Sequence, residues 1–149
     1  MAITVPNEYS YVLVAVTSTF FVNTFHGLLT SRHRKASGVA YPAPYATAEE
    51  AAKNPKAYKF NCAQRAHANF TENLVPAVGA MLIAGLRHPV AAAGMGITWS
   101  IARVIYALGY TSNAGPKGRE VGAILGSLTD LALKLTAAYT AVTLAMEQF

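Results

Sequence analysis

The sequence has few charged residues for its size, and this shortage limits the class of protein it can be. Charged side chains make up 13% of the 149 residues, whereas hydrophobic side chains make up 53%. A typical soluble domain carries about 25% charged residues, so this chain could hardly cover a water-facing surface. The composition therefore favours an integral membrane protein, and the length fits a single domain spanning residues 1–149.

Cysteine is nearly absent as well, because Cys62 is the single one in the sequence. It cannot form an internal disulfide, and no spacing of Cys and His matches a zinc site. The net charge is +5, and the basic residues are concentrated in two connections between the apolar segments. A nucleic-acid-binding protein would instead carry them along one face or in a tail. We therefore predict no metal and no nucleic-acid partner. Residues 1–9 also lack Lys and Arg, so we expect the first apolar run to be retained rather than cleaved as a signal peptide.

Long apolar segments dominate what remains. Residues 9–30 are uncharged and long enough to cross a hydrocarbon core of roughly 30 Å. Further helices are predicted at 59–86, 89–111 and 119–146, and the two-residue link after the second of the four helices requires an antiparallel hairpin. The proline-containing connection 31–59 is predicted to be a loop with one short helical turn at 46–53. The predicted fold class is an all-α integral membrane protein with four transmembrane helices in an up-down bundle.

Basic residues are concentrated in two of the connections. The first holds Arg32, Arg34, Lys35, Lys53, Lys56 and Lys59, and the second holds Lys117 and Arg119. On the opposite side Arg87 stands alone. Because short loops rich in Lys and Arg stay in the cytoplasm, we predict that these two connections are cytoplasmic and that both termini lie on the far side.

Several polar residues fall inside the predicted spans, where each is costly unless it faces a partner or a water-filled cavity. Arg65, Asn69 and Glu72 follow i, i+4 and i+7 spacing and share one helix face. Arg103, Tyr106 and Tyr110 form a second stripe on the next helix, ending at the same cytoplasmic side. We predict that the two stripes line one cavity.

Other polar residues have structural interpretations beside functional ones. Asp130 and Lys134, at i and i+4, fit a structural ion pair. Arg103 is either a scaffold residue paired with Glu72 or Asp130, or part of the site. Tyr110 fits an interfacial aromatic belt as well as a cavity. Three histidines at span ends or in loops are predicted to lie at the surface: His26, His33 and His88.

The two stripes have a recognisable chemistry. Arginines with amide and phenol donors suit a small anion whose carboxylates can accept paired hydrogen bonds. Glu72 would accept from an ammonium group on the same ligand. Glutathione carries both kinds of group, and a cation close to its sulfur would increase the fraction of reactive thiolate.

These residues also resemble a known family. The segments FNCAQRAHANFTE (60–72) and RVIYALGY (103–110), followed by a Gly/Pro turn with Lys117 and Arg119, resemble the MAPEG proteins, the membrane-associated proteins of eicosanoid and glutathione metabolism. The resemblance covers nearly the whole chain and is greatest to the type 3 microsomal glutathione S-transferases. It implies a homotrimer in the endoplasmic reticulum or mitochondrial outer membrane. Glutathione would bind between subunits, and lipophilic electrophiles or hydroperoxides would arrive from the bilayer.

The resemblance also implies roles for particular residues. By position, the glutathione-binding residues would be Arg34, Arg65, His67, Asn69, Glu72, Tyr106 and Tyr110. Arg119 is the candidate catalytic cation that activates the thiol, with Lys117 as the fallback because the turn differs in length from that of the leukotriene synthases. Those synthases have Tyr where this chain has Asn73, which argues against leukotriene synthase activity.

The predicted function is therefore a membrane glutathione transferase, with glutathione peroxidase activity as a further possibility and glutathione as co-substrate. The alternative is a non-catalytic lipid-binding or scaffold protein of the same architecture. Retention of Arg65, Asn69, Glu72 and both tyrosines argues against that alternative.

Overall fold

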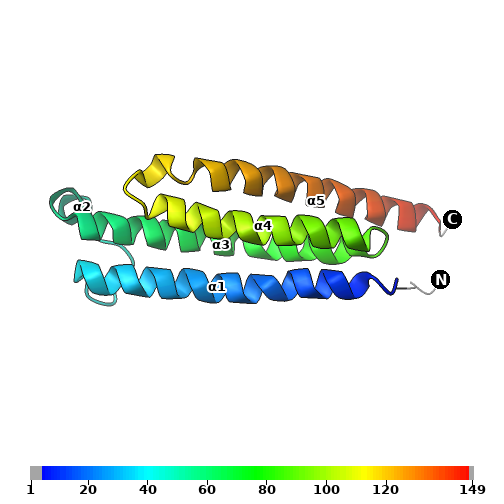
Figure 1. Cartoon of the computed structure of the whole chain (residues 1–149), viewed down its shortest axis with the longest axis horizontal. Helices are drawn as coiled ribbons and strands as arrows, with labels where there is room; N and C mark the ends of the chain where they lie inside the picture. Colours follow the sequence, from blue (N-terminus) through cyan, green and yellow to red (C-terminus); the bar gives the residue numbers. More distant parts are fainter. Residues whose placement is uncertain (1–4, 148–149) are drawn as a thin grey trace.

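The computed structural model describes residues 5–147, and these residues form helices, turns and loops with no β-strand. The elements in chain order are α1 (Tyr9–Ser37), α2 (Ala48–Lys53), α3 (Pro55–Gly85), α4 (Pro89–Tyr110), the single 3₁₀ turn η1 (Gly115–Lys117) and α5 (Glu120–Met146). Four of these helices are long, and they run side by side as an elongated bundle (Figure 1).

The first helix is longer than the predicted span 9–30. It continues through the basic segment to Ser37, where Gly38 adopts a left-handed conformation (φ 76°) and donates its N–H to the carbonyl of Arg34. The end of the apolar run predicts where the chain leaves the hydrocarbon core, but it does not predict where the helix ends. Arg and Lys are good helix formers, so the helix can continue into water. The helix therefore ends at a glycine cap rather than at the first charge.

The third helix starts earlier than the predicted residue 59. Asn54 caps it by accepting a hydrogen bond from the backbone N–H of Lys56, and Pro55 occupies its first position. Asn followed by Pro is a start signal for a helix, since the missing proline N–H is not needed there. The preceding short helix α2 falls within the predicted turn 46–53 and begins with a capping box between Thr47 and Glu50.

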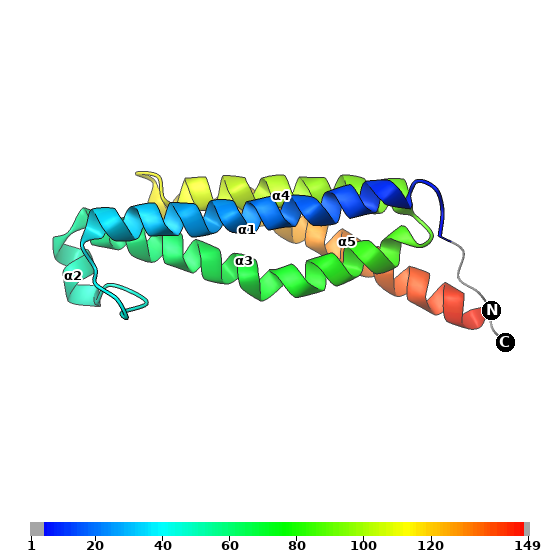
Figure 2. The same ribbon diagram turned by 90° about the horizontal axis from the view of Figure 1, so that it is seen from below.

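Two outer helices pack on a central pair. Both α1 and α5 contact α3 and α4, and Figure 1 shows them on opposite sides of that pair. The α3–α4 link lies at the same end of the bundle as the start of α1 and the end of α5, and α2 and η1 lie at the other end (Figures 1 and 2). The two connections rich in Lys and Arg are thus neighbours, and their cytoplasmic orientation stays a prediction.

Small residues let the helices approach closely, as is common in membrane bundles. Half of the buried positions of α3 and α4 are alanine, and the rings of Trp99 and Phe70 pack at a tilt in the core, with a centroid distance of 5.7 Å. Pro76 lies inside α3 and cannot donate to the carbonyl of Glu72 four residues earlier. Figure 2 shows α3 bending in its middle, which is the expected effect of an internal proline.

Three helical segments are long and apolar enough to cross a membrane: Tyr9–Ser37, Pro89–Tyr110 and Gly115–Met146. Large apolar side chains on their outer faces, such as Phe21, Leu128 and Leu135, are exposed. Exposed apolar faces of this kind suit contact with lipid. The helix that carries the Arg65 stripe, α3, is not among the three.

His26 corrects one prediction, because it is buried rather than at the surface. Its side chain is only 1% exposed and stacks on Phe70 at a centroid distance of 4.8 Å. It belongs to the face of α1 that points into the bundle. This face holds Val12, Ala15, Thr19, Val22, His26 and Thr30 at helical spacing. This spacing can be recognised in the sequence itself. Helical periodicity therefore predicts the burial of His26 better than its distance from the end of the span does.

Candidate functional site

A cavity of about 570 Å³ opens between α3, α4 and α5. Its lining is polar on the α3 and α4 sides. The lining residues are Arg65, Asn69, Asn73, Arg103, Tyr106, Arg119, Glu120, Ala123, Ile124 and Ser127. Two members of each predicted stripe therefore meet in one cavity, together with the start of α5, whereas Glu72 and Tyr110 are not among its lining residues.

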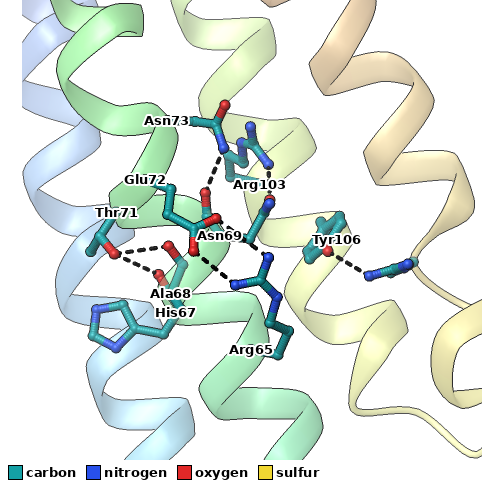
Figure 3. A network of polar contacts seen from close by, with 10 residues as sticks. Arg65, His67, Ala68, Asn69, Thr71, Glu72, Asn73, Arg103 and Tyr106 are labelled. Carbon is teal, nitrogen blue, oxygen red and sulfur yellow. Dashed lines mark hydrogen bonds and ion pairs between the residues drawn. The ribbon is translucent and has the colours of Figure 1, made fainter.

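Arg65 and Glu72 form a paired contact along one face of α3. Nη1 of Arg65 lies 2.8 Å from Oε1 of Glu72, and Nη2 lies 3.4 Å from Oε2 (Figure 3). Their side chains are 47% and 52% exposed, so solvent or a ligand can reach both ends of the pair. An ion pair so exposed contributes little to stability, which leaves both groups free to exchange partners with a charged ligand.

Arg103 lies deeper and is 6% exposed. Its Nη1 donates to Oδ1 of Asn69 at 2.8 Å (Figure 3). Its guanidinium carbon lies 4.9 Å from the centre of the Trp99 ring. The sequence left open a pairing with Glu72 or Asp130. In the structure, Arg103 instead contacts the side-chain amide of Asn69 and the face of the Trp99 ring, while Glu72 is paired with Arg65. Asn69 thus fixes the position of a buried cation.

Replacing Asn69 with Ala should destabilise the protein, because it removes the hydrogen-bond acceptor of a buried arginine. We expect a loss of about 2 kcal/mol in the free energy of unfolding, as is typical for a hydrogen bond to a charged group. Thermal unfolding in detergent measures it. Thr71→Ala is the matched control, since the Thr71 hydroxyl bonds only to carbonyls of its own helix and is exposed. Equal stability of the two variants would show that Asn69 does not hold Arg103.

Arg119 reaches the mouth of the cavity from the start of α5. Its Nη1 donates to the Tyr106 hydroxyl at 3.0 Å, and its guanidinium carbon lies 4.7 Å from the centre of the Tyr110 ring. The two tyrosine rings pack edge to face at 5.7 Å. Tyr110 therefore supports Arg119 as an aromatic platform, while Tyr106, as acceptor from Arg119, keeps its own O–H free to donate.

Glycines bring α5 close enough to α4 for this contact. A Cβ on Gly122 would lie 2.4 Å from the backbone N of Tyr106, and one on Gly109 would lie 2.0 Å from the carbonyl oxygen of Gly118. Both contacts are with backbone, so no side chain can move aside. Only glycine allows these approaches, and they place Arg119 beside Tyr106.

Four of the seven predicted binding residues are not among the cavity-lining residues: Arg34, His67, Glu72 and Tyr110. Glu72 and Tyr110 each contact an arginine that does line it, Arg65 and Arg119. His67 points towards α1, where its Nε2 lies 3.3 Å from Oδ1 of Asn23. Arg34 lies on α1, which is on the other side of the α3–α4 pair, and its Nη1 donates to the carbonyl of Ala43 at 2.8 Å. Its guanidinium also stacks between the rings of Tyr41 and Phe60. Arg34 holds the α1–α2 loop in place and cannot reach the cavity of its own chain.

The structure also settles or extends other details. The predicted ion pair between Asp130 and Lys134 is present on α5. Asn73 and Ser127 line the cavity without having been predicted as site residues. Asn73 lies four residues after Asn69, so extending the α3 stripe by one turn would have found it. Ser127 has no such signal, because an isolated serine on an apolar helix is not distinctive.

The fold and this site define a class of protein: a helical membrane protein with a polar, arginine-rich cavity set among apolar helices. Comparison with family models matches residues 12–139 to the MAPEG family. This match spans most of the chain, and the protein belongs to the MAPEG family, which includes glutathione transferases and related members.

Proposed function

We propose that the protein is a membrane glutathione transferase, closest in type to the type 3 microsomal enzymes. It joins the glutathione thiolate to lipophilic electrophiles and also reduces lipid hydroperoxides. The observation that carries the proposal is the meeting of Arg65, Asn69, Tyr106 and Arg119 in one cavity. Family membership supports it independently.

Charge complementarity assigns the two ends of glutathione. Arg65 would bind a carboxylate, because a guanidinium presents two parallel donors to it. Glu72 would accept from the ammonium group of the γ-glutamyl end. The existing contact between these side chains, with nitrogen–oxygen distances of 2.8 and 3.4 Å, keeps both in place before the ligand binds. Binding then replaces one ion pair by two and exposes no charge.

Arg119 and Tyr106 are placed to stabilise the sulfur of glutathione as a thiolate. Arg119 is a cation at the N-terminus of α5, where the helix dipole adds further positive potential. Tyr106 accepts a hydrogen bond from Arg119 at 3.0 Å and can donate its own O–H to a thiolate. Both effects favour the charged form of the thiol, which is the nucleophile. We assign Arg119 as the catalytic cation and Tyr106 as its partner.

Two reactions follow from such a thiolate. In conjugation, sulfur forms a bond to an electrophilic carbon, and a leaving group departs or the product takes up the thiol proton. In peroxide reduction, the thiolate attacks the hydroperoxide, and a second glutathione completes the reaction to glutathione disulfide, an alcohol and water. Glutathione is the co-substrate in both, and no step requires a metal.

We further propose that the protein is a homotrimer in the endoplasmic reticulum or mitochondrial outer membrane. Arg65 and Glu72 are about half exposed on α3. If α3 crosses the bilayer with the other three long helices, charged groups at this depth need cover other than lipid. A neighbouring copy supplies such cover and would bring its own Arg34 or His67 to the ligand. This accounts for the distance of both residues from the cavity of their own chain.

The assignment of Arg65 and Glu72 can be tested by titration with glutathione. Arg65→Ala and Glu72→Gln should each weaken binding about tenfold or more, because each leaves one ligand charge without a partner. Thermal unfolding of each variant without glutathione shows separately whether the fold tolerates the change. The matched control is Arg87→Ala, because Arg87 is also a half-exposed arginine paired with a glutamate, Glu147, but at the other end of the bundle. If all three variants bind glutathione equally, the proposed binding site is wrong.

A second candidate function is lipid binding without catalysis. A groove of about 410 Å³ lies between α1 and α3, lined almost entirely by apolar side chains such as Phe20, Leu74 and Leu82. An acyl chain would fit a surface of this kind. Titration with glutathione separates the two functions, because a protein that binds lipid alone would show neither saturation nor the ultraviolet band of a thiolate.

A further inference from the structure

The cavity between α3, α4 and α5 contains further polar residues deeper than those at its mouth. Arg65 and Arg119 lie towards the mouth, and Asn73 and Ser127 lie eight residues further along the chain from each of them. Both α3 and α5 run away from the α2 end of the bundle (Figures 1 and 2). Asn73 and Ser127 are therefore roughly 12 Å deeper than the two arginines.

Arg103 lies at about the same depth as Ser127. A Cβ on Gly126, the residue before Ser127, would lie 4.0 Å from Nε of Arg103. Arg103 and Ser127 both line the cavity, one from α4 and the other from α5. We name the deep end of the cavity, lined by Asn73, Arg103 and Ser127, the cavity floor.

Two hydrogen-bond donors at the cavity floor have no partner within residues 5–147. Arg103 donates from Nη1 to Asn69, whereas its Nη2 makes no hydrogen bond in this part of the chain and, unlike Nε, is not a buried atom. The Ser127 hydroxyl makes none there either, although Thr129 and Thr136 on the same helix donate to carbonyls four residues earlier. Because both residues line the cavity, a ligand can accept from both donors.

We propose that Arg103 and Ser127 bind the carbonyl oxygen of the second substrate and stabilise the negative charge that develops on it. The proposal rests on the proposed function and names the class of its second substrate, an α,β-unsaturated carbonyl compound with an apolar tail. A carbonyl oxygen has two lone pairs and can accept from both donors at once. The bond from the guanidinium is the stronger of the two, because its donor is charged.

The two donors act on the bond-forming step. The thiolate sulfur forms a bond to the β-carbon, and the electron pair of the carbon–carbon double bond shifts so that the carbonyl becomes an enolate. Arg103 and Ser127 donate to the enolate oxygen, and their hydrogen bonds strengthen as its charge develops. The α-carbon then takes a proton from water, which balances the proton released by the thiol. No oxidant or further co-reactant is needed.

The cavity floor is within reach of a substrate that is attacked beside Tyr106. Gly122 packs against the backbone of Tyr106, and Ser127 follows five residues later, roughly 7.5 Å further along α5. Helical side chains lean towards the N-terminus, which brings the Ser127 hydroxyl back towards the level of Tyr106. Only the α-carbon and the carbonyl carbon separate the attacked carbon of an enal from its oxygen. Ala123 and Ile124 also line the cavity and offer apolar contacts to the hydrocarbon.

The charge of Arg103 disfavours other occupants of the cavity floor. An ammonium group would be repelled by the guanidinium. A carboxylate of glutathione would lose its hydration shell at this depth, whereas Arg65 offers it a partner that is 47% exposed. A neutral carbonyl enters without that cost and becomes charged only as the new bond forms. The floor therefore binds the transition state more tightly than the substrate, which is the condition for catalysis.

The test compares two electrophiles of the same chain length, a medium-chain 2-enal and a 1-iodoalkane, which has no carbonyl. Each kcat/KM is divided by the uncatalysed rate constant with glutathione. Ser127→Ala should lower the normalised value for the enal about tenfold or more, the scale of a hydrogen bond to a charged oxygen. The value for the iodoalkane, the glutathione affinity and the thiolate band should not change.

The Ser127→Ala variant should fold normally, because Ser127 is exposed and alanine favours the helix. Ser31→Ala is the matched control. Ser31 is also an exposed helical serine without a side-chain hydrogen bond in the described part of the chain, but it lies on α1, which does not line the cavity. This control should keep both normalised values.

The outcomes separate the role of the cavity floor from the proposed function. An equal loss with both electrophiles would show that Ser127 acts on the thiolate, and weaker glutathione binding would show that the floor holds the peptide; either result would overturn the carbonyl site alone. An unchanged value for the enal, or no turnover of the enal by an unmodified protein that forms the thiolate band, would overturn it too. Absence of glutathione binding in the unmodified protein would overturn the proposed function together with the carbonyl site.

Discussion

Arg119→Ala should remove the thiolate band that forms on binding glutathione and should lower kcat/KM for conjugation about 10²-fold to 10³-fold. That range is typical for removal of one donor that stabilises a negatively charged reacting atom. Arg119 is the cation nearest the Tyr106 hydroxyl, at 3.0 Å, and its guanidinium is fixed by the Tyr110 ring. Without it, Tyr106 alone would have to stabilise the thiolate.

The affinity for glutathione should change much less than the rate, because Arg65 and Glu72 hold the ends of the peptide away from the sulfur. Lys117→Ala is the control, since Lys117 lies on the exposed turn η1 only two residues from Arg119. It should keep both the band and the rate. The reverse result, with Lys117 essential and Arg119 dispensable, would contradict the assignment of the catalytic cation.

Arg119→Lys separates charge from geometry. A lysine keeps the positive charge, but its ammonium is a compact point charge that cannot stack flat on the Tyr110 ring as a guanidinium does. We expect a thiolate band of reduced intensity and a rate between those of the unmodified protein and Arg119→Ala. Ultraviolet titration and steady-state kinetics on the same preparations measure both quantities.

Much of the site could be predicted from sequence because helical periodicity places residues on faces. Arg65, Asn69 and Glu72 share one face of α3 by spacing alone, and the structure directs that face towards Arg103 and Tyr106. The short link between α3 and α4 made their antiparallel pairing a necessity. Helical spacing and link length were enough to predict the position of a residue wherever that position depends on one helix, or on two helices joined by a short link.

Other parts depend on how distant helices pack, which periodicity does not reveal. His67 lies between Arg65 and Asn69 in sequence but faces α1, where Asn23 is its partner. The same limit applies to Arg103, since only the packed bundle shows that Asn69 is its acceptor.

The position of Arg119 shows how packing and chemistry are linked in this protein. An arginine in a turn between two membrane helices would ordinarily point to solvent or to lipid headgroups. Here the backbones of Gly109 and Gly118 are in direct contact, which closes the turn tightly against α4. The close turn directs Arg119 back over the two tyrosines, so the chain provides a cation at the cavity mouth without burying it.

Gly122→Ala should destabilise the protein and move Arg119 away from Tyr106. The new Cβ would lie 2.4 Å from the backbone N of Tyr106 and 2.8 Å from the carbonyl oxygen of Ala102. Overpacking of this kind costs about 1–3 kcal/mol or more, which exceeds the gain of about 1 kcal/mol from replacing glycine by alanine in a helix. Relief requires α5 to move away from α4, which lengthens the contact between Arg119 and Tyr106.

Thermal unfolding in detergent and the thiolate band measure the two effects of Gly122→Ala on one sample. Gly126→Ala, one helical turn further along α5, is the matched control because its Cβ makes only ordinary contacts. It should unfold at the same or a higher temperature and should keep the thiolate band. If Gly122→Ala behaves like Gly126→Ala in both measurements, close approach of α5 to Tyr106 is not what positions Arg119. If it loses the band while remaining folded, the approach of these two helices is itself a requirement for activating the thiol.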